Sequence, residues 1–210
     1  MISPAPYATR RAEVSFCADE IETERLRLRM FTLDDLRPLS LMTKDPEVMK
    51  YIGTGKPITT EETRFSLAKI VETFRRRGFG RWAVIHKEAN ELIGYCGFAM
   101  LEEKAGVELA YLLGRPFWGK GLATEAARAC LRYGFDELHF DCIAAITRPE
   151  NKRSQRVMEK VGMRYLRRAP HCHIECVHYA ISKEEFVFTG EPYTLRRSLS
   201  HSLGAHPVAQ

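Results

Sequence analysis

Several stretches of the chain have patterns typical of β-strands, in which hydrophobic and polar residues either alternate with a period of two or give way to a short, mostly apolar run. Arg25, Arg27 and Arg29, for example, alternate with apolar residues at positions 26, 28 and 30. Polar turns separate the next three such stretches, which therefore predict an antiparallel meander. Strands are expected at residues 25–30, 81–86, 92–101, 106–113, 141–147, 163–168 and 173–181.

Capping residues and apolar spacing mark the helices between these strands. Side chains that can accept a hydrogen bond from a first helical turn predict helix starts after Thr32, Asp45, Thr59 and Ser182. The helix after Thr59 should end at Gly78. Its apolar face is expected to consist of Phe65, Ala68, Val71 and Phe74. Apolar spacing predicts two more helices, at residues 122–138 and 152–161.

The order of these elements predicts the fold class. Three antiparallel strands lead into a crossover in which residues 122–138 form a helix between two strands, and such a crossover joins parallel strands. We therefore expect an α+β fold with a mixed, mostly antiparallel central sheet flanked by helices. One domain is expected at residues 21–186, with an N-terminal arm at residues 1–20 and a C-terminal tail at residues 187–210.

Composition narrows the class of protein without naming a function. Hydrophobic residues make up 45% of the 210, and 32 Lys and Arg against 27 Asp and Glu give a net charge of +5. That excess is too small for a dedicated nucleic-acid arm but is compatible with a polyanionic cofactor. No apolar run approaches the roughly 20 residues of a membrane span, and no secretory signal is evident. The six cysteines do not resemble a disulfide framework, so a reduced, cytoplasmic protein is predicted.

A glycine-containing loop at residues 114–121 joins a predicted strand directly to a predicted helix. Backbone N–H groups at a helix start, together with the positive end of the helix dipole, attract anions. Gly119 and Gly121 remove side chains that would block close approach, and Lys120 adds a positive charge. The arrangement is typical of phosphate binding, although an ordinary tight turn with two glycines is the alternative.

One class of phosphate loop fits this stretch poorly. Gly114, Gly119 and Lys120 match the nucleoside-triphosphate pattern G-x-x-x-x-G-K, but Gly121 occupies the position where Ser or Thr must ligate magnesium. Such a loop also follows the first strand of a parallel fold, whereas this one follows a meander. A nucleoside triphosphatase is therefore disfavoured.

A second class fits better. Trp118, Gly121 and Ala123 match, apart from the first position, the pyrophosphate-loop pattern of the GNAT superfamily of N-acetyltransferases: Gln or Arg, two residues, Gly, one residue, then Gly or Ala. The chain resembles in particular the branch that acetylates the N-terminal alanine of ribosomal proteins. This resemblance spans about residues 21–186. Its motifs are TERLRLR at residues 23–29, DPEVM at 45–49, WGKGLATEA at 118–126, and residues 151–163.

The resemblance implies that acetyl-coenzyme A (acetyl-CoA) binds in a cleft where the strand ending at Leu113 diverges from the strand at residues 141–147. Backbone groups of Tyr111, Leu112 and Leu113 would pair with the pantetheine arm, which Asn151 would also reach. The pyrophosphate would contact Trp118, Gly119, Lys120, Gly121, Leu122, Ala123 and Thr124. The remaining phosphate could meet Arg115, Lys120 or Arg153.

Acetyl transfer to an amine needs a base, and the departing thiolate benefits from a hydrogen-bond donor. Glu108 matches a glutamate that acts as the base in parts of the superfamily, although a solvated strand glutamate is the alternative. Many members place a tyrosine donor where this chain has Met158, which cannot donate a proton. Ser154 matches a serine proposed as the donor in the ribosomal branch, although Ser is common in a first helical turn.

Two other interpretations, a metal site and a nucleic-acid surface, fit the sequence less well. Residues 171–178 are rich in Cys and His, but alternation on a strand splits them between two faces, so no metal site is expected. Basic groups at residues 75–77, 152–156 and 164–168 could face nucleic acid or a ribosome, but no direct nucleic-acid binding is expected. The sequence thus predicts a GNAT-like N-acetyltransferase that binds acetyl-CoA and acts on a primary amine, most simply a protein or peptide N-terminus. The alternatives are a small-molecule or antibiotic amine and a CoA-binding regulatory protein without turnover; a monomer and a homodimer are both compatible.

Overall fold

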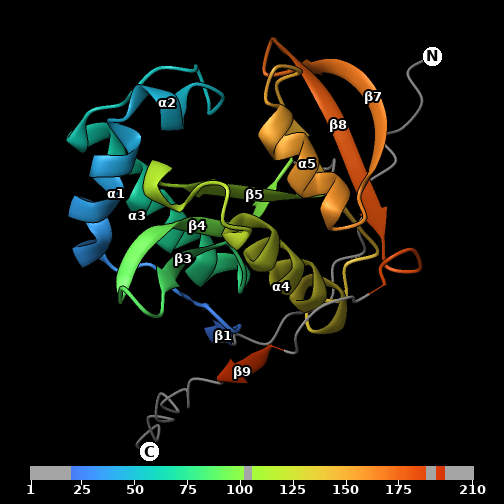
Figure 1. Ribbon diagram of the computed structural model, residues 1–210, viewed down its shortest axis with the longest axis horizontal. Helices are drawn as coiled ribbons and strands as arrows, with labels where there is room; N and C mark the ends of the chain where they lie inside the picture. Colours follow the sequence, from blue (N-terminus) through green and yellow to red (C-terminus); the bar gives the residue numbers. More distant parts are fainter. Residues whose placement is uncertain (1–19, 102–105, 188–192, 197–210) are drawn as a thin grey trace, which may run out of the picture.

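A computed structural model describes residues 20–101, 106–187 and 193–196 (Figure 1). Nine strands in these residues form one sheet in the order β7-β8-β6-β5-β4-β3-β2-β1-β9. The strands are β1 Glu20–Glu22, β2 Leu26–Arg29, β3 Arg81–His86, β4 Glu91–Met100, β5 Val107–Leu113, β6 Cys142–Thr147, β7 Arg164–His171, β8 Ile174–Ser182 and β9 Thr194–Arg196. Every neighbouring pair is antiparallel except β5 and β6. The α+β fold with a mixed, mostly antiparallel sheet is therefore confirmed.

Helices cover both faces of this sheet. They are η1 Leu33–Asp35, α1 Leu36–Thr43, α2 Pro46–Met49, α3 Thr60–Arg77, η2 Arg115–Phe117, α4 Leu122–Asp136 and α5 Lys152–Lys160. In Figure 1, α4 and α5 lie in front of the sheet, and α3 lies behind it. The core under α4 contains Trp82, whose ring meets those of Phe98 and Tyr133 edge to face at 6.0 and 5.2 Å. A second cluster on the other face joins the α1–α3 region to Tyr95 and Leu112.

Three of the predicted helix starts are confirmed by their capping residues. Thr32 and Asp35 form a capping box before α1, and Thr59 and Glu62 form one at α3. The side chain of Asp45 accepts a hydrogen bond from the backbone N–H of Glu47 at the start of α2. These interactions join residues two or three positions apart, so the sequence alone could predict them.

The predicted apolar face of α3 was wrong in part. Phe65 is 71% exposed and Ala68 is also exposed, whereas Thr63, Leu67 and Phe74 are buried. Thr63 enters the core because its hydroxyl lies 2.7 Å from the hydroxyl of Thr43 on α1, which satisfies both groups. The buried face of α3 therefore keeps Phe74 but passes through Thr63 and Leu67 in place of Phe65 and Ala68, about a quarter of a turn from the predicted face.

The predicted helix after Ser182 is not found in the described residues, where 183–185 form a turn. The capping hydrogen bonds exist, since Ser182 and Glu185 each accept at 3.3 Å from the other's backbone N–H, but they close only a turn. Phe186 then packs against Phe135 of α4, with ring centroids 5.1 Å apart. This tertiary contact leads the chain away from the turn before a helix can propagate.

The strand β9 lies within the segment that was expected to be a tail. It pairs with β1, placing Leu195 opposite Ile21, and Tyr193 and Leu195 pack against the main core. Glu20, at the end of the expected arm, belongs to β1. The remainder of the expected arm and tail, at residues 1–19, 188–192 and 197–210, lies outside the described residues.

Candidate active site

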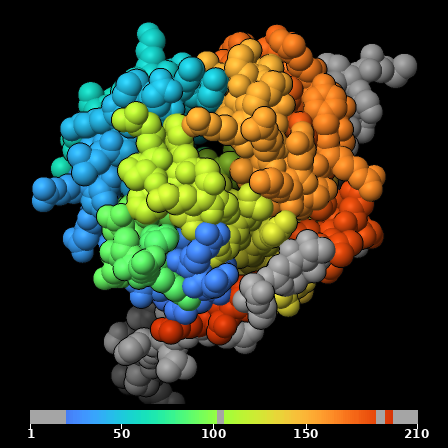
Figure 2. Space-filling view, viewed as in Figure 1, coloured from blue at the N-terminus to red at the C-terminus, as the bar shows by residue number. Residues whose placement is uncertain are grey.

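The strands β5 and β6 separate soon after they meet. Their only register pairs are Val107 with Ile143 and Glu108 with Ala144, although β5 continues to Leu113 and β6 to Thr147. Beyond these pairs, no strand in the described part of the chain pairs with the β6 side of β5, so the two strands bound a cleft. Figure 2 shows a hollow between the yellow-green segment that includes β5 and the start of α4 and the orange segment that includes α5. The splayed strands thus lie where the sequence resemblance implied.

The β4–β5 ladder decides which backbone groups face this cleft. The N–H of Gly114 donates to the carbonyl of Ile93 at 2.8 Å, and alternate residues of an antiparallel strand bond to the same neighbour. Leu112 therefore turns its backbone toward β4, and its side chain lies in the second core cluster. Tyr111 and Leu113 direct their N–H and C=O groups toward the cleft, where the Leu113 carbonyl already accepts the indole N–H of Trp118 at 2.7 Å.

The glycine loop, residues 114–121, contains two glycines with left-handed backbone near its C-terminal end. Gly119 and Gly121 have φ values of 76° and 80°, which residues other than glycine rarely adopt. Gly121 is the N-cap of α4 and offers no capping side chain, so the N–H groups of Leu122, Ala123 and Thr124 have no acceptor within the helix. A Cβ at Gly119 would meet nothing within 4 Å. Open space, free donors and the helix dipole together fit a diphosphate such as that of CoA.

An ion-pair network anchors this loop to the segment before β2. The Glu125 carboxylate accepts hydrogen bonds from the Thr23 hydroxyl at 2.6 Å and from the backbone N–H and Nε of Arg25 at 2.9 and 2.7 Å. Arg25 also donates from Nη1 to the Lys120 carbonyl at 2.9 Å. The carbonyl of Lys120 is thereby held on the Arg25 side of the loop. The sequence patterns did not predict this role for Arg25 and Glu125, although both residues lie in the motifs TERLRLR and WGKGLATEA.

The three cations near the loop have different partners. Arg115 donates from Nε to Asp45 at 2.6 Å and is thus engaged with the start of α2. The Arg153 guanidinium lies 5.0 Å from the centre of the Trp118 ring, and the Lys120 ammonium lies 5.5 Å from that of Phe117. Lys120 and Arg153 make no ion pair within the described residues. No carboxylate therefore balances their positive charges, which can attract a bound anion.

Glu108 lies on the opposite face of β5 from Tyr111, as strand alternation predicted. It is half-buried, and burial raises the pKa of its carboxyl group, while the nearby positive charges of Arg81 and His171 oppose that rise. The Arg81 guanidinium lies 5.3 Å from the centre of the Tyr95 ring on the same face of the sheet. A carboxylate with a raised pKa accepts a proton more readily than an ordinary glutamate, and this one lies beside the point where two strands diverge.

The start of α5 forms the other wall of the cleft. Asn151 caps the helix by accepting from the Ser154 N–H at 3.2 Å and donating to the Thr147 hydroxyl at 3.0 Å, so its side-chain amide joins α5 to β6. The Ser154 hydroxyl lies 2.8 Å from the Tyr111 hydroxyl, across the cleft from β5. Met158 is 1% exposed in the core under α4.

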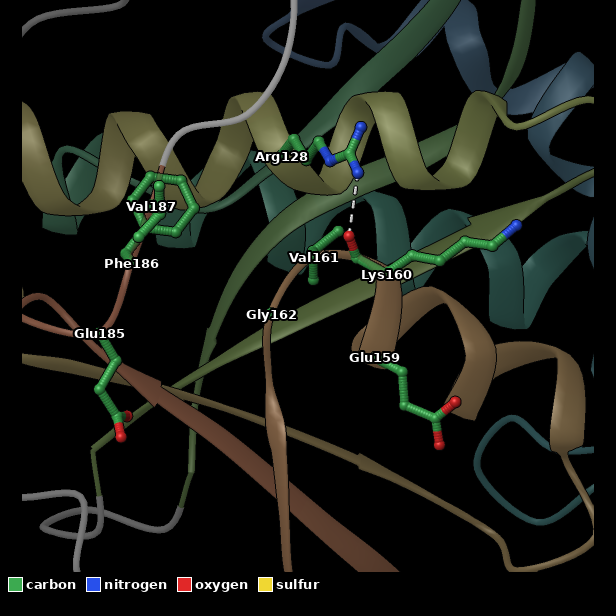
Figure 3. A pocket seen from close by; sticks show the side chains of 8 residues that line it. All are labelled: Arg128, Glu159, Lys160, Val161, Gly162, Glu185, Phe186 and Val187. Atoms are coloured by element: carbon green, nitrogen blue, oxygen red, sulfur yellow. Dashed lines mark hydrogen bonds between the residues drawn. The ribbon is translucent and has the colours of Figure 1, made fainter.

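A separate pocket of about 240 Å³ lies away from these residues, between the middle of α4, the end of α5 and residues 185–187 (Figure 3). Its Arg128 donates to the Lys160 carbonyl at 3.0 Å. Figure 3 shows the Lys160 side chain pointing away from the pocket. None of the predicted catalytic or cofactor-binding residues lines it.

The Cys- and His-rich segment forms the β7–β8 hairpin. The rings of His171 and His178 are 6.5 Å apart, and the described residues hold no group of three or more His, Cys, Asp or Glu placed to bind a metal ion. The five cysteines that the structure describes are free thiols. In the same residues, no helix is long and apolar enough to cross a membrane.

Comparisons with known proteins agree with this geometry. An uncharacterised N-acetyltransferase, p20, of Bacillus licheniformis is 35% identical over 145 residues, covering 69% of this chain and 82% of p20. A GNAT-family acetyltransferase structure from Bacillus anthracis is 35% identical with a TM-score of 0.70, covering 79% of this chain and 99% of that one. A ribosomal-protein-S5-alanine acetyltransferase from Vibrio fischeri has a TM-score of 0.67 over 80% of this chain and 98% of its own, but at 16% identity it shares only the fold. Residues 25–164 match the family model of an acetyltransferase (GNAT) domain, and the chain therefore belongs to the GNAT family of N-acetyltransferases.

Proposed function

We propose that this N-acetyltransferase acetylates the amino terminus of a protein or peptide, with acetyl-CoA held in the cleft between β5 and β6. The observation that carries the cofactor site is the early divergence of these strands beside a helix start with free N–H groups. The GNAT family implies the use of acetyl-CoA. The acceptor is the finer part of the proposal.

Backbone groups would supply most of the binding. The N–H groups of residues 119–124 would hold the diphosphate, with Lys120 and Arg153 neutralising the phosphates. Tyr111 and Leu113 would pair with the amides of the pantetheine arm as a further strand would. Asn151 would act by fixing α5 against β6, since both ends of its amide group are engaged there.

When bound, acetyl-CoA supplies an acetyl group on a thioester bond. In the proposed reaction, the acceptor nitrogen forms a bond to the acetyl carbon, and the bond from that carbon to sulfur breaks. Glu108 takes the proton that the nitrogen loses, directly or through one water. Ser154 donates a hydrogen bond to the sulfur, which leaves as a thiolate and needs stabilisation of its negative charge.

The charges around Glu108 support an acceptor with a single amino group. Arg81 and His171 both act on its carboxylate as positive charges. A polyamine would bring several positive charges to this neighbourhood, and like charges in a half-buried site repel. A peptide N-terminus that has lost one proton from its ammonium group has no positive charge there and can approach as a neutral amine. The sequence motifs shared with the ribosomal branch point to the same class.

The test is thiol release from acetyl-CoA with alanine- and serine-ended peptides, polyamines and aminoglycosides, alongside calorimetric CoA binding. We expect saturable CoA binding and release with the peptides. Faster release with spermidine or an aminoglycoside would replace the peptide by a small-molecule amine. Saturable binding without release from any acceptor would favour a CoA-binding regulatory protein, for which the buried Met158 at the usual tyrosine position is the supporting observation.

A further inference from the structure

The hydroxyl group of Tyr111 joins the two walls of the cleft. Tyr111 lies on β5 and Ser154 in the first turn of α5, 43 residues later. The Tyr111 Oη lies 2.8 Å from the Ser154 Oγ, and it donates to the Ser154 backbone carbonyl at 3.1 Å. The contact spans the gap that opens where β5 and β6 diverge.

Two arrangements of hydrogens satisfy these distances. If Tyr111 donates to the carbonyl, the Ser154 hydroxyl donates to Tyr111 and its proton is occupied. If Tyr111 donates to the Ser154 Oγ, the proton of Ser154 is free to point elsewhere. Burial raises the pKa of Tyr111 well above that of an ordinary tyrosine, so its hydroxyl keeps its proton and remains able to donate.

The second arrangement suits a negative charge in the cleft. A thiolate attracts the proton of Ser154, and Tyr111 can then turn its own proton from the carbonyl to the Ser154 oxygen. A hydrogen bond accepted by a hydroxyl strengthens the one that it donates. No covalent bond is broken in this exchange, since both protons stay on their own oxygens.

We propose that Tyr111 is a positioning residue that orients the Ser154 hydroxyl toward the sulfur of bound CoA. This inference rests on the proposed role of Ser154 and extends it. The hydroxyl pair would take the place of a single tyrosine donor on α5, where Met158 is buried and has no proton to give. Tyr111 would thus contribute twice, through its backbone along the cleft and through its hydroxyl group across it.

The test measures the pKa of the thiol of CoA itself, bound to the protein, from the ultraviolet absorbance of the thiolate. A donor stabilises the thiolate and lowers that pKa. We expect Ser154→Ala to raise the thiol pKa by about 1 to 2 pH units, the equivalent of one charge-assisted hydrogen bond. Tyr111→Phe should raise it by a similar amount, and the double variant should titrate like Ser154→Ala alone, because Tyr111 acts through Ser154.

The matched control is Tyr179→Phe. The Tyr179 hydroxyl donates to Glu159 at 3.3 Å, so this variant also removes the phenol hydroxyl of a buried tyrosine, but one that contacts α5 five residues after Ser154. This variant should leave the thiol pKa unchanged. In turnover, Tyr111→Phe should lower kcat by the same factor as Ser154→Ala with no change in the KM for acetyl-CoA.

Three results would overturn the inference. They are a Tyr111→Phe protein whose bound thiol titrates like that of the parent, a double variant with a higher thiol pKa than Ser154→Ala, and an equal shift in Tyr179→Phe. Ser154→Thr, which keeps a hydroxyl group, should preserve the effect of Tyr111→Phe. The titration needs no acceptor, so it tests the role of Tyr111 even in a protein that acetylates no amine. A parent protein that binds CoA but acetylates no amine would refute the proposed function, and the thiol pKa values would still decide the Tyr111 inference.

Discussion

Glu108→Gln should lower kcat by about 10²- to 10⁴-fold, the usual contribution of a positioned general base, without changing the affinity for CoA. The amide has nearly the shape of the carboxylate but cannot accept the proton that the acceptor nitrogen loses. Glu108 lies on the face of β5 opposite Tyr111, away from the glycine loop, so cofactor contacts should persist. The measurement is steady-state thiol release together with calorimetric CoA binding.

The pH dependence of the parent enzyme should follow the same carboxyl group. Burial raises the pKa of Glu108, so kcat/KM should rise with pH through a midpoint above the ordinary glutamate range, as the group loses its proton. The positive charge of Arg81 opposes the rise in the pKa of Glu108. Arg81→Gln should therefore move the midpoint to higher pH, since it removes a charge that favours the ionised carboxylate.

Glu91→Gln provides the matched control, because it makes the same chemical change at an exposed position on β4. It should behave like the parent at every pH. Equal rates for Glu108→Gln and the parent across the pH range would remove Glu108 from the mechanism.

The second large effect is expected at Glu125, where Glu125→Ala should both destabilise the fold and weaken CoA binding. The carboxylate accepts hydrogen bonds from Thr23 and Arg25, and its side chain is 17% exposed. Losing charge-assisted hydrogen bonds of this kind costs about 1.5 to 3 kcal/mol of unfolding free energy, reduced here by solvent screening of the partly exposed Arg25. Freed from Glu125, Arg25 also loses its orientation toward the Lys120 carbonyl, so we expect a roughly tenfold rise in the KM for acetyl-CoA, the equivalent of one such contact.

The stability contributed by Glu125 should depend on pH in a defined direction. Burial raises the pKa of this group, but the hydrogen bonds from Thr23 and Arg25 outweigh burial and hold the pKa below its usual value. A group with a depressed folded-state pKa stabilises the protein above its unfolded pKa and loses that contribution as the pH falls through the folded value. The difference in melting temperature between parent and Glu125→Ala should therefore shrink in acid.

Glu61→Gln serves as the comparison for this experiment. Glu61 pairs with Arg64 on α3 at 3.4 Å, but both side chains are largely exposed, and such pairs contribute about 0 to 1 kcal/mol. Thermal denaturation of both variants across the pH range provides the measurement, together with steady-state kinetics for the KM. If Glu125→Ala melts like Glu61→Gln and keeps the parent's KM for acetyl-CoA, the network does not support the loop.

Much of the fold followed from local patterns along the chain. The meander at β3, β4 and β5 was predicted from short, mostly apolar stretches separated by polar turns, and the crossover to β6 from the helical apolar spacing of residues 122–138 followed by another short apolar stretch. The starts of η1, α2 and α3 were predicted because capping residues act within three positions of the helix start. Contacts between distant elements caused the errors: Thr63 is buried by its bond to Thr43 on another helix, and Phe186 meets Phe135 instead of extending a helix.

The candidate site divides along the same line. By itself, the sequence determined the glycine loop and the helix that follows it, since a left-handed backbone at Gly119 and Gly121 and the free N–H groups of a helix start are properties of neighbouring residues. Only the tertiary structure decided that the Tyr111 hydroxyl contacts Ser154 across the cleft, and that Glu125 accepts hydrogen bonds from Arg25, 100 residues away in the sequence. Such pairs form because separate strands and helices pack together. A periodic sequence pattern does not show which side chains this packing brings within hydrogen-bond distance.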